Sequence, residues 1–113
     1  MESKDVFLLE NIIGFCEGIE RAVARFGDDY RIFDGDLDYQ DACEMKIVQM
    51  GENVADLSEG FKEQHPEIPW RNIVGTRNII VHDFVVLSSE KVWETIKNDI
   101  PRLKDFCLQQ IEK

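Results

Sequence analysis

Apolar residues recur at alternating intervals of three and four positions along much of this 113-residue chain. The first series consists of Leu9, Ile12, Cys16, Ile19, Val23 and Phe26. Because an α-helix has about 3.6 residues per turn, this spacing places the whole series on one side of a helix. A helix with such an apolar stripe must bury it against another element. The spacing therefore predicts a protein built from packed helices.

The same spacing occurs in three further segments. A second helix is predicted to begin near Asp38 and to end near Gly60. Its apolar side carries Tyr39, Cys43, Ile47, Met50, Val54, Leu57 and Phe61. A third helix is predicted from Pro69 to His82, since proline fits the first helical position without losing a bond. A fourth helix is predicted after Ser88-Ser89, which can cap its first turn. Its apolar side carries Trp93, Ile96, Ile100, Leu103 and Cys107.

Turn-forming residues separate these segments. Glycine and aspartate at 27–29 and 34–36 predict a loop after the first helix, and 65–69 form a short linker. Pro101 predicts a kink in the last helix, because proline lacks an N–H and crowds the preceding turn. No segment shows a convincing strand pattern. We therefore expect an all-α fold, an antiparallel four-helix (up-down) bundle with a kinked last helix, forming one domain over residues 1–113.

Composition limits the classes of protein that need to be considered. Apolar residues make up 43% of the chain and charged residues 32%, which is typical of a folded, soluble protein. No apolar run has the length of a membrane span, and the N-terminus lacks the features of a signal peptide. We expect a cytoplasmic protein that does not associate with membranes. Cys16, Cys43 and Cys107 lie in apolar surroundings, which favours buried, reduced thiols. Neither a metal nor another cofactor is expected.

The charge distribution argues against a general nucleic-acid binder. The net charge is −10, whereas proteins that bind nucleic acid broadly usually have a basic surface. Residues 69–82 are an exception, since they include Arg71 and Arg77 but no aspartate or glutamate. A small basic cleft on an acidic protein can still hold one or two phosphates.

Arg77 and His82 are the candidate catalytic residues. Histidine titrates near neutral pH, so His82 is a candidate general acid or base. Arg77 projects from the middle of an apolar arc, a costly position unless its guanidinium meets a carboxylate, a phosphate or a water-filled cleft. The arc consists of Trp70, Ile73, Val74, Ile80 and Val81. In the alternative interpretation, Arg77 forms a buried structural ion pair and His82 simply ends the helix.

Other residues are given roles relative to this pair. Gly75, Asn78 and His82 share a second arc, which predicts a contact surface that a symmetry mate can use. Glu52 and Glu44 are rival partners for Arg77, and the helical pattern does not decide between them. Trp70 and Trp93 are expected to be core or interface anchors. His65 is expected to be a solvent-facing linker residue.

Several motifs in order resemble the HepT-like toxins of the HEPN superfamily. These motifs are Gln49-Met50-Gly51-Glu52, residues 68–75 (IPWRNIVG), Arg77-Asn78 through His82, Val92-Trp93, and residues 99–103 (DIPRL). The resemblance implies a helical bundle that forms a two-fold dimer with an Arg-x4-His ribonuclease site in the dimer cleft. It also implies a partner antitoxin of the minimal nucleotidyltransferase type. Arg77 and His82 match the catalytic pair, and the family pattern supports Glu52 as the partner of Arg77.

One position departs from the family pattern. The family often continues as His-x-Tyr, with the tyrosine adenylylated by the antitoxin, but here Phe84 has no hydroxyl to modify. The resemblance implies the toxin of a toxin–antitoxin pair, a metal-independent endoribonuclease that cuts RNA with Arg77 and His82, supported by Asn78 and Glu52. One alternative is a non-catalytic nucleotide-binding or docking module of a two-subunit nucleotidyltransferase. Another is a helical dimerisation domain in which both residues are structural.

Overall fold

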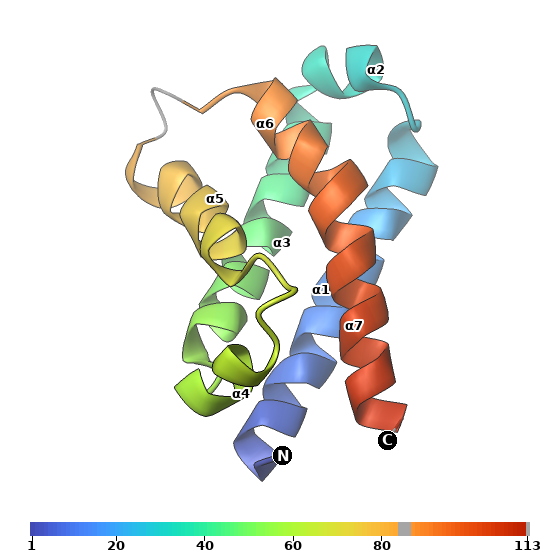
Figure 1. The fold of residues 1–113 in the computed structure, drawn as a ribbon. Helices are drawn as coiled ribbons and strands as arrows, with labels where there is room; N and C mark the ends of the chain where they lie inside the picture. The colour runs from blue at the N-terminus through green and yellow to red at the C-terminus, as the bar shows by residue number, and fades with distance from the viewer. Residues whose placement is uncertain (84–86, 113) are drawn as a thin grey trace.

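Four long helical segments pack side by side, and consecutive segments run in opposite directions (Figure 1). The computed structural model describes residues 1–83 and 87–112. Its elements are α1 (Ser3–Phe26), α2 (Tyr30–Asp34), α3 (Leu37–Asp56), α4 (Glu59–Gln64), α5 (Trp70–His82), α6 (Ser89–Glu94), η2 (Thr95–Asp99) and α7 (Ile100–Glu112). Over these residues no strand occurs. The prediction of an all-α, up-down bundle is confirmed.

The core lies where the apolar stripes of the long helices meet. α1 packs against α3 and α7, and α5 packs against α3 and η2, which closes the bundle. The predicted stripe residues form this core, including Leu9, Ile12, Cys16, Ile47, Met50, Ile100 and Leu103, each at most 1% exposed. Burial of this apolar surface is the main force that holds the helices together. Among the helices of the described residues, none is both long and apolar enough to cross a membrane.

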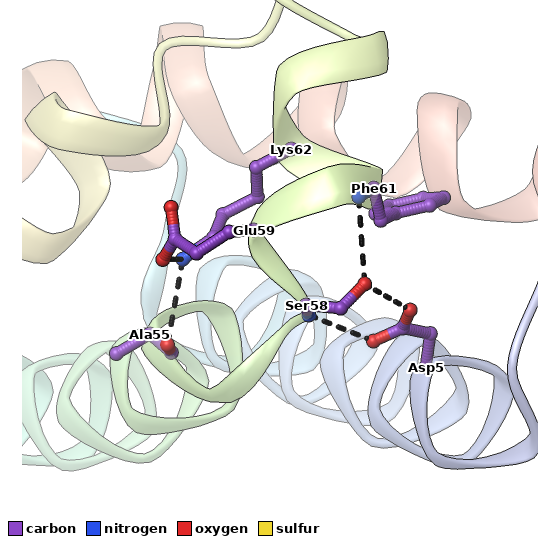
Figure 2. Close-up of polar contacts among 6 residues, drawn as sticks. All are labelled: Asp5, Ala55, Ser58, Glu59, Phe61 and Lys62. Carbon is purple, nitrogen blue, oxygen red and sulfur yellow. Dashed lines mark hydrogen bonds and ion pairs between the residues drawn. The ribbon is translucent and has the colours of Figure 1, made fainter.

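The second predicted helix is divided in two, which corrects the expected end near Gly60. α3 ends at Asp56, and α4 begins after Ser58, whose hydroxyl accepts a hydrogen bond from the N–H of Phe61 at 3.4 Å. Asp5 of α1 accepts the backbone N–H of Ser58 at 2.9 Å and its hydroxyl at 2.6 Å (Figure 2). In an unbroken helix that N–H would bond to the carbonyl of Val54. The buried carboxylate replaces this helical bond, so the helix ends here.

The loop that connects the first two predicted helices contains the short helix α2. Asp29 caps it by accepting the N–H of Arg31 at 2.8 Å. Phe33 is fully buried, and α2 contacts both α3 and α6. Gly27 ends α1 with a φ of 124°, a backbone conformation that favours glycine. α2 therefore covers one end of the bundle rather than being an open loop.

The last helical segment changes its geometry just before Pro101. η2 is a π-helical turn between α6 and α7. In a regular α-helix the N–H of residue 101 would bond to the carbonyl of Lys97, but proline has no N–H and its ring crowds that carbonyl. A wider π-helical turn relieves this conflict without ending the helix. The disturbance predicted at Pro101 thus takes the form of a local change in helical pitch.

Candidate active site

Arg77 lies where α5 crosses α3 at Gly51 and Glu52. A Cβ atom added to Gly51 would lie 2.6 Å from the Cβ of Arg77, so the arginine stem packs directly on the α3 backbone. The Oε1 atom of Glu52 accepts hydrogen bonds from Nε of Arg77 at 3.0 Å and from Nη2 at 2.5 Å. Glu52 is therefore the carboxylate that meets Arg77.

Glu44, the rival carboxylate, lies elsewhere on α3. It lines a cavity of about 120 Å³ together with Phe33, Leu37, Leu87 and Val92, among others. Burial raises the pKa of the Glu44 carboxyl, and the neighbouring charge of Asp41 raises it further. Glu44 thus belongs to the junction of α2, α3 and α6.

The ion pair of Arg77 is not buried, which corrects the expectation of a charge enclosed by apolar neighbours. The side chain of Arg77 is 24% exposed and that of Glu52 is 53% exposed. Nη1 of Arg77 also donates to Oδ1 of Asn78 at 2.5 Å. A guanidinium has five N–H donors, and these contacts use three of them. The arginine is held in place, and its other two donors have no partner among residues 1–83 and 87–112, so they are available to another anion.

His82 is the last residue of α5, and its side chain is exposed. The N–H of Asp83 donates to the carbonyl of Ile79 at 2.9 Å and closes the helix. Arg77 and His82 are five positions apart, which is about 140° around a helix, so they point in different directions. Asn78 is one turn before His82 and lies on the same side of α5. Within one chain the structure brings together Arg77, Glu52 and Asn78, and His82 lies one turn beyond Asn78 on α5.

A groove of about 620 Å³ adjoins this cluster between α5, α4 and the end of α3. We call it the α4–α5 groove; it is lined by Ala55, Glu59, Lys62, Glu63, Pro66, Trp70, Arg71, Val74, Gly75 and Asn78. Outside the adjoining backbone of α5, no atom of the described residues lies within 4 Å of a Cβ added to Gly75, so this side of α5 is open. The sequence indicated a small basic cleft at residues 69–82, but not that α4 forms its other wall. The helical spacing of Arg71, Gly75 and Asn78 is the signal that points to it.

The two tryptophans have structural positions. Trp70 is 9% exposed, and its Nε1 donates to the carbonyl of His65 at 3.0 Å. Trp93 packs against Phe33 and Tyr39, with ring centroids 5.2 and 6.2 Å away. The prediction that both residues are core or interface anchors is confirmed for the core.

Two other predictions from the sequence are not confirmed by the structure, and one concerns a residue that the structure does not describe. The ring of His65 lies 4.9 Å from those of both Phe61 and Phe106, so the prediction of a solvent-facing residue is wrong. Val81, expected on the apolar arc of α5, is 44% exposed. Phe84 lies outside the described residues.

Cysteine positions agree with the predicted buried thiols. Cys16, Cys43 and Cys107 are all buried and free. Burial raises the pKa of the Cys16 and Cys107 thiols to about 12 and that of Cys43 to about 11. In residues 1–83 and 87–112, no three His, Cys, Asp or Glu side chains are grouped so that they could hold a metal ion.

Comparison with known proteins identifies the family of this chain. The family described as "Ribonuclease HepT-like" matches residues 12–109. "Putative RNase TTE0752" of Caldanaerobacter subterraneus subsp. tengcongensis is 30% identical over 105 residues, 93% of this chain and 92% of the relative. "Probable ribonuclease HepT" of Thermococcus cleftensis is 38% identical over 55 residues, 49% of this chain and 50% of the relative.

A third relative belongs to the same group. "Putative RNase MJ1380" of Methanocaldococcus jannaschii is 28% identical over 81 residues, 64% of this chain and 74% of the relative. No solved structure matches the chain. The family match covers most of the chain, including Glu52, Arg77 and His82. This chain therefore belongs to the HepT-like ribonuclease family of the HEPN superfamily.

Proposed function

We propose that this protein is a metal-independent endoribonuclease that acts as the toxin of a toxin–antitoxin pair. The observation that carries the proposal is the position of Arg77, which is fixed by Glu52 and Asn78 while two of its N–H donors have no partner in the described part of the chain. A preorganised cation of this kind stabilises charge that develops on a phosphoryl group. Membership of a ribonuclease family makes RNA the substrate that fits.

The reaction begins with proton transfer at the ribose. Neutral His82 removes the proton of a 2′-hydroxyl, and the resulting oxygen attacks the adjacent phosphorus. The bond from phosphorus to the 5′-oxygen breaks, and that oxygen takes a proton from an imidazolium. Arg77 stabilises the negative charge on the non-bridging oxygens. The products are a 2′,3′-cyclic phosphate and a free 5′-hydroxyl, so no outside reactant is needed.

A second copy of the chain supplies the proton for the leaving group. A two-fold axis at the surface formed by Gly75, Asn78 and His82 brings two His82 side chains to one cleft, one acting as base and the other as acid. Two features support this arrangement: a Cβ added to Gly75 would meet open space, and His82 is exposed at the end of α5. In a single chain, by contrast, Arg77 and His82 diverge around the helix axis.

The partner that restrains this activity is a nucleotidyltransferase-type antitoxin. Because residue 84 is a phenylalanine, the antitoxin acts on another hydroxyl or blocks the cleft. Tyr39 is fully buried and donates its hydroxyl to the carbonyl of Gly27 at 3.0 Å, whereas Tyr30 is half-buried. Peptide mapping after treatment with antitoxin and ATP tests this: an adenylyl group on the peptide that carries Phe84, with no other nucleophile modified, contradicts the proposal.

The nuclease assignment is tested with purified wild-type protein and His82→Ala, each incubated with total RNA. Wild-type protein should cut the RNA and arrest growth on expression, and the variant should do neither. The variant should remain folded, since His82 is exposed. Equal cutting by both proteins would remove His82 from the mechanism. Binding of nucleotide without cutting by the wild type would instead favour the non-catalytic docking module.

A further inference from the structure

We infer that the α4–α5 groove binds single-stranded RNA beside the cut, and that Arg71 is the residue that holds a phosphate there. The inference rests on the proposed function, which it extends from the catalytic pair to the path of the substrate. It depends on the placement of Arg71, on the charges of the groove walls and on the link between the groove and Arg77.

Arg71 lies on the same side of α5 as the residues of the proposed active site. Gly75, Asn78 and His82 follow it by four, seven and eleven positions, a spacing that keeps all four residues on one side of a helix. The distance along the helix axis from Arg71 to His82 is about 16 Å at 1.5 Å per residue. A polynucleotide lying along this side of α5 would pass from Arg71 to the histidine.

Arg71 is available to bind an anion. It is exposed, and it forms no ion pair or side-chain hydrogen bond with another residue in the part of the chain that the structure describes. Arg21, Arg25 and Arg102 also have no carboxylate partner among the described residues, so what distinguishes Arg71 is its position on the wall of the α4–α5 groove. A free guanidinium can bind a phosphate through two parallel N–H donors.

Lys62, the other cation of the groove, is already engaged. Its Nζ lies 3.3 Å from Oε1 of Glu59 and donates to the carbonyl of Ala55 at 3.4 Å (Figure 2). The α4 wall also carries Glu63. The carboxylates repel phosphate from the α4 wall, so the attractive position is on the α5 wall, at Arg71. The apolar groups of Pro66, Trp70 and Val74 provide surface on which a base can pack.

Asn78 connects the groove to the catalytic cluster. It lines the groove, and its Oδ1 accepts a hydrogen bond from Nη1 of Arg77. The groove volume of about 620 Å³ is within the usual range for ligand pockets. Gly75 and Asn78 also belong to the proposed dimer surface, so the groove opens at the edge of the dimer cleft. RNA held by Arg71 is therefore led toward Arg77 and His82.

The test measures binding of a 2′-O-methylated single-stranded RNA pool to the full-length protein at several salt concentrations. This probe keeps the phosphates and cannot be cut by attack of a 2′-hydroxyl. The variants are Arg71→Ala, Arg71→Lys and the matched control Arg25→Ala. Arg25 is also exposed, and its loss changes the net charge equally, but it lies at the far end of α1 from α4 (Figure 1).

Arg71→Ala should raise the Kd about tenfold, the effect of losing one charge-assisted contact. It should also reduce the slope of log K against log salt by about 0.7, since one phosphate contact is lost. Arg71→Lys should keep the slope and bind with intermediate affinity, and Arg25→Ala should stay close to wild type. In cleavage assays the larger effect of Arg71→Ala should fall on KM.

Two results would overturn the inference. One is the same Kd and salt slope for Arg71→Ala and Arg25→Ala. The other is conversion of the protein into a monomer by Arg71→Ala, which would make the groove an interface between copies. If wild type cuts RNA and Arg71→Ala binds like wild type, only this inference fails. If His82→Ala still cuts RNA, the proposed mechanism fails while the binding result for Arg71 stands.

Discussion

The Cβ atom of Arg77 occupies the space that a side chain at Gly51 would need. An alanine Cβ at position 51 would be 2.6 Å from Cβ and 2.9 Å from Cγ of Arg77. These are the stiff inner atoms of the arginine, so a larger residue must push α3 and α5 apart. The glycine therefore sets the depth at which Arg77 sits, and the next residue, Glu52, holds the guanidinium.

Gly51→Ala should lower both activity and stability. Alanine favours a helix by about 1 kcal/mol over glycine, but overpacking at a close contact costs about 1–3 kcal/mol. The cost of the collision should exceed the gain in helix propensity, so the variant should be less stable. Displacement of Arg77 should also reduce kcat/KM by about 10²-fold. Gly14→Ala is the matched control, because nothing lies within 4 Å of a Cβ added there. It should melt at or above the wild-type temperature; a Gly51→Ala protein that also melts higher and cuts normally would contradict the argument.

Arg77→Ala should reduce activity far more than stability. The ion pair with Glu52 is partly exposed, and such pairs contribute only about 0–1 kcal/mol to folding. Loss of a preorganised cation should lower kcat by about 10²–10³-fold. Glu52→Gln keeps an acceptor oxygen but loses the charge, so kcat should fall by a smaller factor, about tenfold. Thermal melting and steady-state kinetics on the same preparations check this. A large fall in melting temperature for Arg77→Ala would restore the buried-pair interpretation.

Cleavage should need no metal and should require the ribose 2′-hydroxyl. Arg77 and His82 supply a fixed cation and a proton acceptor, which suit transfer within the ribose phosphate. The upstream fragment should end in a 2′,3′-cyclic phosphate or its hydrolysis product. Assays with EDTA, single-stranded DNA and 2′-O-methylated RNA test this. Loss of cutting on addition of EDTA, or equal cutting of DNA, would be incompatible with attack by the 2′-hydroxyl.

The protein should form a dimer in solution through the surface that contains Gly75, Asn78 and His82. Light scattering at micromolar concentration should give twice the chain mass of 13.2 kDa. Gly75→Leu should favour the monomer, because its side chain would project from the open side of α5 into the contact. The same variant should lose activity, since a monomer lacks the second histidine. A wild-type monomer that cuts RNA would exclude the shared cleft.

The three cysteines should be unreactive in the folded protein and should make it sensitive to alkali. Burial raises the pKa of Cys16 and Cys107 from 9.0 to about 12 and that of Cys43 to about 11. The folded state therefore keeps its protons at a pH where the unfolded chain loses them. The free energy of unfolding should be constant with respect to these groups below pH 9.0 and should fall as the pH rises toward 12.

Thiol reagents and urea unfolding check this prediction. A disulfide-exchange reagent at pH 8 should label the native protein very slowly and should label all three cysteines in guanidinium. The urea midpoint should decrease between pH 9.5 and 11. Rapid labelling of one native cysteine, or a urea midpoint that does not change with alkali, would show that the thiols are accessible to solvent.

The four apolar helical stripes, most of the core and the family could be recognised from the sequence alone. Spacing of three and four positions is a local property of the chain, so the buried stripes of α1 and α7 could be predicted from it. The same reasoning predicted three buried cysteines and drew attention to Arg77 and His82. These features depend on residues within a few turns of one another.

The choice of the carboxylate that holds Arg77 depends on how α5 packs against α3. Glu44 and Glu52 lie two turns apart on α3, and helical periodicity treats them as near equals. The choice depends on where α5 crosses α3, which is set by the absence of a side chain at Gly51. The break at Ser58 likewise depends on Asp5, 53 positions earlier in the chain. Contacts between residues far apart in sequence leave little local pattern, because each residue could pair with many others. The packing of the helices determines which of these possible partners lies close enough to form the contact.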